Sequence, residues 1–201
     1  MAAVDQLNPA EVTAAILAGG EGRRVDGRDK GLLPLAGKQM IAHVAAALHG
    51  QAGVIVICTS RHQGDYAAFG QVVQDATSDF RGPLAGIASA LADCPTPWLL
   101  TVPVDGPDLP VDLAARLHAA AVAGSANVAV AYDGICRQPL FALYRSALAA
   151  SAAEALARNS PVWRWQEEIG AAQADFSGAP QAFANLNTLG EFRDWERRHA
   201  S

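Results

Sequence analysis

A glycine-rich stretch near the N-terminus is followed closely by four basic side chains. The stretch runs from Ala18 to Gly22 after an apolar run, and the basic side chains are those of Arg23, Arg24, Arg28 and Lys30. Glycine lets the backbone turn tightly and present successive N–H groups to phosphate oxygens. The basic side chains add positive charge in a chain whose formal net charge is −5. This local excess predicts a polyphosphate site, and the alternative is a turn with solvated basic residues.

Two common nucleotide-binding motifs do not fit this stretch. The dinucleotide fingerprint G-x-G-x-x-G fails because Val25 stands where its last glycine is required. The P-loop motif fails because Arg28 and Asp29 stand where lysine and serine or threonine are required. The stretch therefore indicates a third kind of nucleotide loop, in which Lys30 follows the arginines.

Two aspartates are expected at the same edge of a predicted sheet. Asp105 follows the apolar run 98–102, and Asp75 follows a weak strand at 72–73. Ligands of α/β sheets bind beyond the carboxyl ends of the strands, and Mg²⁺ prefers carboxylates together with phosphates. Asp105 is therefore a candidate Mg²⁺ ligand, and its alternative role is to cap a turn. For Asp75 the alternative is a helix N-cap or a turn.

Asn185 and Asn187 lie in or beside a short strand that is expected at 183–186. Side chains two residues apart on a strand point to one face, so the two amides could bind a polar heterocycle or a phosphate. The alternative is a cap for the last helix, because Thr188 and Glu191 fit a capping box.

Three tryptophans and one further aspartate have mainly structural interpretations. Trp163, Trp165 and Trp195 could stack on a ligand, but aromatic residues at helical spacing are more often part of a core. Asp108 is expected to be a solvated turn residue.

The order of apolar runs and helical patterns predicts an α/β fold. We expect a Rossmann-like three-layer arrangement, with a mostly parallel central sheet, helices on both faces and one antiparallel excursion near 133–144. Residues 1–201 are expected to form a single domain with one hydrophobic core. Strands are expected at 13–17, 54–58, 72–73, 98–102, 128–131, 138–144, 174–176 and 183–186, and helices at 39–49, 66–69, 82–93, 111–123, 146–158, 161–169 and 188–199.

Composition excludes several classes of protein. With 51% hydrophobic and 17% charged residues, the chain is globular rather than disordered. It contains no apolar run of about 18 residues and no pattern of a secretory signal. Its three cysteines form no C-x-x-C pair, which favours a reducing cytoplasm. Neither a membrane nor a nucleic acid is expected as a partner, since nucleic-acid binders carry a basic face.

The motifs together resemble those of the molybdenum cofactor guanylyltransferases, the MobA family within the nucleotidyltransferase group. One position departs from the family, because Cys58 stands where asparagine is common after the second strand. Cys58 is therefore not assigned to the site. The resemblance rests on Leu17-Ala18-Gly19-Gly20, Arg23-Arg24, Asp29-Lys30-Gly31-Leu32-Leu33, Gly37-Lys38, Gly82-Pro83-Leu84-Ala85-Gly86, Asp105-Gly106-Pro107 and Asn185-Leu186-Asn187-Thr188.

This resemblance implies a reaction, its substrates and the roles of residues. GTP and the terminal phosphate of molybdenum-molybdopterin would give the guanine dinucleotide cofactor and pyrophosphate, with Mg²⁺ on Asp105. Arg24, Lys30 and Asp105 would be catalytic, Asn185 and Asn187 would bind the pterin, and assembly factors of molybdoenzymes are expected as partners. The residues implied for nucleotide binding are Leu17, Ala18, Gly19, Gly20, Lys30, Asp75, Gly82 and Asp105.

Other functions remain open at this level. Within the enzymes, the alternatives are a cytidylyltransferase for the same pterin and a sugar-phosphate or polyol-phosphate nucleotidyltransferase. Outside the enzymes, the alternative is a nucleotide-binding regulatory or carrier protein.

Overall fold

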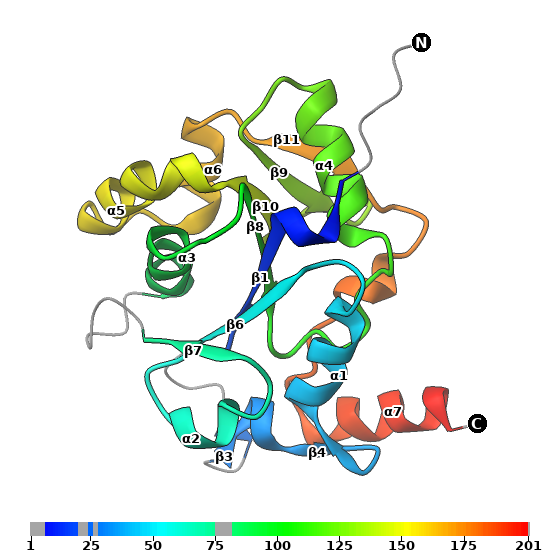
Figure 1. The fold of residues 1–201 in the computed structure, drawn as a ribbon. Helices are drawn as coiled ribbons and strands as arrows, with labels where there is room; N and C mark the ends of the chain where they lie inside the picture. Colours follow the sequence, from blue (N-terminus) through cyan, green and yellow to red (C-terminus); the bar gives the residue numbers. More distant parts are fainter. Residues whose placement is uncertain (1–6, 20–23, 26–27, 75–81, 201) are drawn as a thin grey trace.

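A seven-stranded sheet forms the centre of the protein, in the order β11-β9-β10-β8-β1-β6-β7 (Figure 1). The structure is a computed structural model that describes residues 7–19, 24–25, 28–74 and 82–200. The strands are β1 (Val12–Leu17), β6 (Val54–Cys58), β7 (Gln71–Val73), β8 (Trp98–Pro103), β9 (Val128–Tyr132), β10 (Arg137–Arg145) and β11 (Ala172–Asp175).

The sheet is parallel except at β10, which pairs antiparallel with both β8 and β9. The antiparallel turn begins at Asp133, whose Oδ1 accepts hydrogen bonds from the backbone N–H groups of Ile135 and Cys136. Gly134 follows with φ at 99°, a value that favours glycine. The predicted mostly parallel sheet with one antiparallel excursion is confirmed.

Helices cover both faces of the sheet, as the sequence predicts. Helices α1 and α4 pack on one face, and α3, α5 and α6 pack on the other. The helices are α1 (Met40–Leu48), α2 (Gln63–Tyr66), α3 (Pro83–Ala92), α4 (Leu113–Ala123), α5 (Ala149–Ala157), α6 (Val162–Glu168) and α7 (Leu189–His199). Short 3-10 helices are η1 (Pro9–Glu11), η2 (Lys30–Leu32), η3 (Ser146–Leu148) and η4 (Pro180–Phe183), and two-residue strands form the ribbons β2 (Arg24–Val25) with β3 (Arg28–Asp29) and β4 (Pro34–Leu35) with β5 (Lys38–Gln39).

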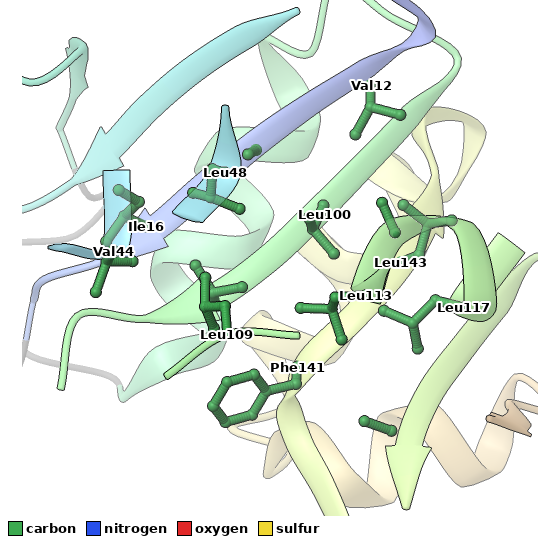
Figure 2. Close-up of a cluster of buried hydrophobic side chains, with 14 of the residues drawn as sticks. Val12, Ile16, Val44, Leu48, Leu100, Leu109, Leu113, Leu117, Phe141 and Leu143 are labelled. Atoms are coloured by element: carbon green, nitrogen blue, oxygen red, sulfur yellow. The ribbon is translucent and has the colours of Figure 1, made fainter. Parts of the chain in front are cut away.

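Strand β1 explains why the sequence shows a continuous apolar run there. All six of its residues are buried, and alternate side chains enter the two cores. Ile16 packs with α1 and α4, on the side shown in Figure 2, while Leu17 packs with α3. A strand that is covered on both faces has apolar side chains at nearly every position, and in β1 the exception is Thr13, whose hydroxyl group is hydrogen-bonded to that of Thr96.

Helix α7 packs outside the two main cores. A separate apolar cluster joins it to the segment around β4 and α1, which lie side by side with it in Figure 1. Asp108 also holds this helix, since Trp195 Nε1 donates to its Oδ1 at 2.8 Å and His199 Nε2 lies 3.2 Å from the same atom. The prediction of a solvated Asp108 is therefore wrong. The cluster consists of Leu33, Leu35, Met40, Leu186, Phe192 and Trp195.

The strand expected at 183–186 is also wrong. Pro180 begins the 3-10 helix η4, and Phe183 ends that helix inside the core. The following residues run extended, and Leu186 N donates to Asp105 O at 2.9 Å. Because β8 ends at Pro103, it offers residues 183–186 no strand edge with which to form a ladder of hydrogen bonds. The alternation of buried and exposed side chains that a strand would show is present in part, since Leu186 is buried and Asn187 is exposed.

The remaining differences are small. Helix α2 lies three residues before the predicted turn at 66–69. Trp165 and Trp195 are buried, as their structural interpretation predicts, while Trp163 is 52% exposed. In the ranges that the structure describes, no helix has the length and apolar character to cross a bilayer.

Candidate active site

The carboxyl ends of β1, β6 and β8 meet at one edge of the sheet. Ala18 N donates to Cys58 O at 2.9 Å, and Val104 N donates to Leu17 O at 3.2 Å. These bonds bring the start of the glycine-rich stretch next to the turn that carries Asp105. The expected meeting of these two segments is therefore observed.

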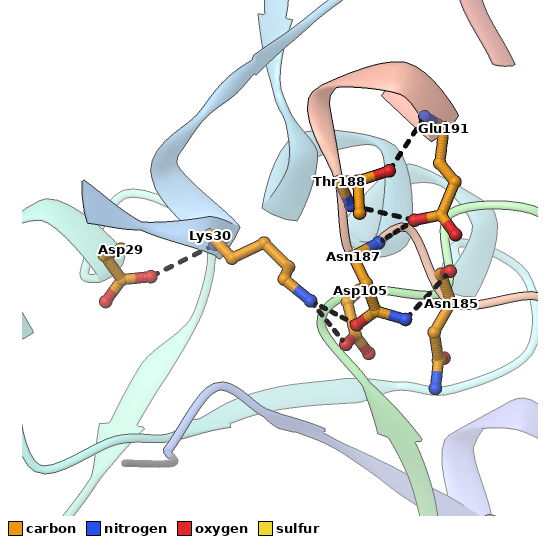
Figure 3. Close-up of polar contacts among 8 residues, drawn as sticks. Asp29, Lys30, Asp105, Asn185, Asn187, Thr188 and Glu191 are labelled. Carbon is orange, nitrogen blue, oxygen red and sulfur yellow. Dashed lines mark hydrogen bonds and ion pairs between the residues drawn. The ribbon is translucent and has the colours of Figure 1, made fainter. Parts of the chain in front are cut away.

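Lys30 joins three distant segments at this edge. Its Nζ lies 3.1 Å from Asp105 Oδ2 and 2.7 Å from Asn187 Oδ1 (Figure 3). Lys30 is 4% exposed and Asp105 is 1% exposed. A buried charge is stable only when it is paired and hydrogen-bonded, so the two side chains depend on each other.

Local structure directs Lys30 to this position. It is the first residue of η2, whose N-cap Asp29 accepts a hydrogen bond from Gly31 N at 3.0 Å. Gly31 is packed closely against two side chains, because a Cβ there would lie 2.8 Å from Val104 Cγ2 and closer still to Tyr66 Oη. Glycine is therefore required by close packing, which accounts for its place after the lysine.

The residues before α7 form a second fixed segment. Glu191 Oε2 accepts from Asn187 N at 2.5 Å and from Thr188 N at 2.8 Å, while Glu191 N donates to Thr188 Oγ1 at 3.2 Å. This is the predicted capping box, so Thr188 caps the helix while Asn187 Oδ1 binds Lys30. The backbone N–H of Asn187, and then that of Thr188, hold the pKa of Glu191 below its usual range.

Asn185 lies beside this segment with a different environment. Its backbone oxygen accepts a hydrogen bond from Asn187 Nδ2 at 3.3 Å (Figure 3). Its side-chain oxygen is buried and has no hydrogen-bond partner among the described residues. A buried amide oxygen without a partner is costly, so this atom is a candidate ligand-binding group.

A small pocket, open to solvent, lies between β1, β6 and the start of α3. Cys58 was left out of the predicted site, but it lies in this wall and its Sγ donates to Gly86 O at 3.4 Å. The strand-end argument used for Asp105 also applies to Cys58, which ends β6, and could have identified it. The pocket is lined by Leu17, Gly19, Cys58, Gly82, Pro83 and Gly86.

Several predicted site residues are placed only in part. Gly20 and Asp75 lie outside the described residues. Arg24 pairs through its backbone with Asp29 in the β2–β3 ribbon. Of the remaining loop residues, Ala18 is half-buried and Gly19 is exposed. The structure thus brings together Lys30, Asp105 and Asn187, and places Leu17, Gly19 and Gly82 around the nearby pocket.

The donor set at Asp105 suits a metal that takes most of its ligands from a substrate. In the described part of the chain, no three histidine, cysteine, aspartate or glutamate side chains gather as a metal site. Mg²⁺ is commonly held by one or two carboxylates, with water and phosphate oxygens as its other ligands. Asp105 therefore fits such an ion as a single protein carboxylate.

The comparisons with known proteins decide the family. Residues 14–173 match the model of the MobA-like NTP transferase domain. The chain belongs to the MobA-like NTP transferases. It is also 41% identical over 185 residues to a molybdenum cofactor guanylyltransferase of Shewanella putrefaciens, covering 91% of this chain and 95% of that one. A protein of the same name from Cupriavidus taiwanensis is 42% identical over 195 residues, covering 94% and 98%.

Solved structures agree with the fold of this family. The molybdopterin-guanine dinucleotide biosynthesis protein A of Archaeoglobus fulgidus has a TM-score of 0.76 at 19% identity, and the match covers 94% of this chain and 98% of that one. A CMP:2-keto-3-deoxy-manno-octonic acid synthetase in complex with CTP has a TM-score of 0.69 at 12% identity, covering 96% and 98%. The chain is a nucleotidyltransferase, as its motifs predict.

Proposed function

We propose that this nucleotidyltransferase moves GMP from GTP to the terminal phosphate of molybdenum-molybdopterin. The products are molybdopterin guanine dinucleotide and pyrophosphate. The observation that carries the proposal is the contact of Lys30 with both Asp105 and Asn187, beside a glycine-lined pocket. This contact places Lys30 and Asp105, whose charges suit a nucleotide, next to Asn187, which lies in the segment implied for the pterin. Relatives that are 36–42% identical and named molybdenum cofactor guanylyltransferase support the same reaction.

The reaction is a single displacement at phosphorus. An oxygen of the acceptor phosphate forms a bond to the α-phosphorus of GTP. The bond from that phosphorus to the oxygen shared with the β-phosphate breaks, and pyrophosphate leaves with the electron pair. The attacking phosphate is already anionic, so the reaction needs positioning and charge neutralisation more than a strong general base.

Lys30 and Asp105 are assigned to the reacting phosphates. Lys30 stabilises negative charge on the α-phosphate, and its burial strengthens that interaction. Asp105 would hold Mg²⁺, which supplies positive charge to the phosphate oxygens when bound. Arg24 and the backbone N–H groups of the glycine-rich stretch bind the leaving pyrophosphate.

The small pocket is assigned to the guanine base and its sugar. Leu17 and Cys58 form part of its wall, and Gly19 and Gly82 let a flat ring approach the backbone. Gly82 has φ at 72°, so a side chain at this position would be strained, and it would also occupy space that we assign to the base. Asp75, with Ala18 and Gly20, completes the proposed set of nucleotide-binding residues.

The acceptor is assigned to the segment before α7. Asn185 presents a buried side-chain oxygen without a partner among the described residues, and Asn187 binds Lys30. We assign both amides to the pterin. We also propose that residues 1–201 act as one domain in the cytoplasm and pass the product to assembly factors of molybdoenzymes.

The test is nucleotide binding followed by pyrophosphate release. In calorimetry with and without Mg²⁺, we expect GTP to bind more tightly than CTP or ATP, with Mg²⁺ strengthening the binding. Pyrophosphate should then appear only when molybdenum-molybdopterin is added.

The other outcomes separate the alternatives. A preference for CTP would move the function to a cytidylyltransferase, and the fold allows this because a CTP-bound synthetase shares it. Release of pyrophosphate with a sugar phosphate would indicate the sugar-phosphate branch. Binding of GTP without any release would indicate a regulatory or carrier protein.

A further inference from the structure

Tyr66 makes a contact with the lysine segment that the proposed reaction does not explain. Its hydroxyl group donates to Asp29 Oδ1 at 2.6 Å, and the same oxygen accepts from Gly31 N at 3.0 Å. Tyr66 is fully buried at the end of α2. The Asp29 side chain, which precedes Lys30, is thus bonded both to the buried Tyr66 hydroxyl group and to the backbone of Gly31, which follows Lys30.

The packing around Gly31 adds a second, independent contact. Gly31 lies against the hydroxyl end of the Tyr66 ring and against Val104, the residue before Asp105. The backbone next to Lys30 is therefore in close contact both with Tyr66 and with the segment that carries Asp105. Figure 3 shows the result, in which the Lys30 side chain extends from Asp29 toward Asp105.

The hydrogen bond to Asp29 keeps its direction over the working pH range. Burial, and then the contact with the Asp29 carboxyl group, raise the pKa of Tyr66 far above its usual range. The phenol therefore stays protonated and remains a donor. A donor bound to a carboxylate makes one of the stronger hydrogen bonds in proteins.

We propose that Tyr66 is a positioning residue for the nucleotidyl transfer, which acts through Asp29 to fix Lys30 beside Asp105. This role rests on the proposed function of Lys30 at the α-phosphate. Tyr66 itself touches no substrate in this role. It also accounts for Asp29 and Gly31, which flank the lysine and have no part in the chemistry.

The test is a double-substitution cycle with Tyr66→Phe and Lys30→Ala. Tyr66→Phe keeps the buried ring and removes only the hydroxyl group. Because a small displacement of a reacting group is costly, we expect kcat to fall about 10- to 100-fold while the KM for GTP changes little. In the Lys30→Ala background the same change should cause no further loss.

Two other tyrosines provide matched controls. Tyr144 is a buried phenol on β10, bound to Gln166 Nε2 at 2.6 Å and paired with Leu99 near the start of β8, away from Asp105. Tyr132 has an exposed hydrogen bond to Gly134 O at 3.0 Å. Tyr144→Phe and Tyr132→Phe should leave kcat unchanged. The proposal is overturned if Tyr66→Phe lowers kcat no more than Tyr144→Phe, or lowers it equally with and without Lys30.

Hydrogen exchange tests the same role without a substrate. In the ligand-free protein, Tyr66→Phe should speed exchange of the Gly31 amide several-fold, because Asp29 loses its second bond. The amides of β8 should not change. Unaltered exchange at Gly31 would overturn the proposal even if transfer of GMP is confirmed. If the wild-type protein transfers no GMP, the proposed function fails separately from this structural result.

Discussion

Lys30 and Asp105 form a buried ion pair, and Asn187 binds the same lysine, so three parts of the chain meet here. The amino group lies 3.1 Å from one carboxylate and 2.7 Å from one amide oxygen. Replacing one partner of such a pair leaves the other charge buried and uncompensated. A substitution of Lys30 or Asp105 alone is therefore expected to change both the stability of the protein and its rate of turnover.

A double substitution separates these two effects. We expect Lys30→Met to lower the rate about 10²- to 10³-fold by loss of one preorganised charge. It should also lower the free energy of unfolding by about 3 kcal/mol, because the buried Asp105 carboxylate loses its lysine partner. Adding Asp105→Asn should recover part of the stability and none of the rate. Urea melts and pyrophosphate release measure both, and a single substitution that leaves stability unchanged would contradict this account.

The sequence predicted these residues but not all of their contacts. Asp105 stands out as a carboxylate at a strand end, and Lys30 as a basic side chain that follows the glycine-rich stretch. Tyr66 and Asp108 could not be identified in this way, because their roles depend on partners far along the chain, such as Asp29 and Trp195.

At the level of the elements, helix α7 is stabilised at its first turn. The capping box formed by Thr188 and Glu191 also fixes the backbone of Asn187. The helix was predicted from its capping pattern, and the sheet from its apolar runs. The false strand at 183–186 arose because a short apolar run does not show whether a neighbouring strand edge is available.

Removal of the cap should loosen both the helix and the site. We expect Thr188→Ala to lower the free energy of unfolding by about 1 kcal/mol and to raise the KM for the pterin substrate. Thr188→Ser keeps the hydroxyl group and should restore both values. If Thr188→Ala destabilises the protein but leaves this KM unchanged, Asn187 is not held by the cap.

The Glu191 carboxylate gives this cap a pH dependence. Since its pKa is lowered in the folded protein, it adds stability that is fully present above the unfolded value of about 4.3. This stability is lost as the pH falls through the lower, folded value. The difference in stability between wild type and Glu191→Gln should therefore shrink below about pH 4. A difference that stays constant on acidification would show that the charge is not involved.

Across the whole molecule, α7 is tied to the turn after β8 by Asp108, and to the segment around β4 and α1 by one apolar cluster. The same turn carries Asp105, so the helix and the central strand share an anchor next to the site. The mostly parallel sheet with one antiparallel excursion could be predicted from alternating strands and helices. This attachment could not, because it depends on side chains that meet only in the folded protein.

Loss of Asp108 should release the helix selectively. We expect Asp108→Ala to lower the free energy of unfolding by about 1–2 kcal/mol through loss of the Trp195 hydrogen bond. Hydrogen exchange should rise in α7 and stay constant in α3. Glu154→Ala, which removes an exposed carboxylate on α5, is the control and should change neither. Equal increases in α3 and α7 would mean that Asp108 supports the whole fold instead.

The meeting of Lys30 with Asn187 spans 157 residues of sequence. A ribosome makes the chain from its N-terminus, so residues 30 and 105 emerge long before residue 187. Contacts between such distant residues also form late in folding, because a long loop must close first. A growing chain can therefore pair its lysine with Asp105 while the amide from residue 187 is still missing. The finished group of three side chains marks a chain that has been synthesised and folded beyond the start of its last helix.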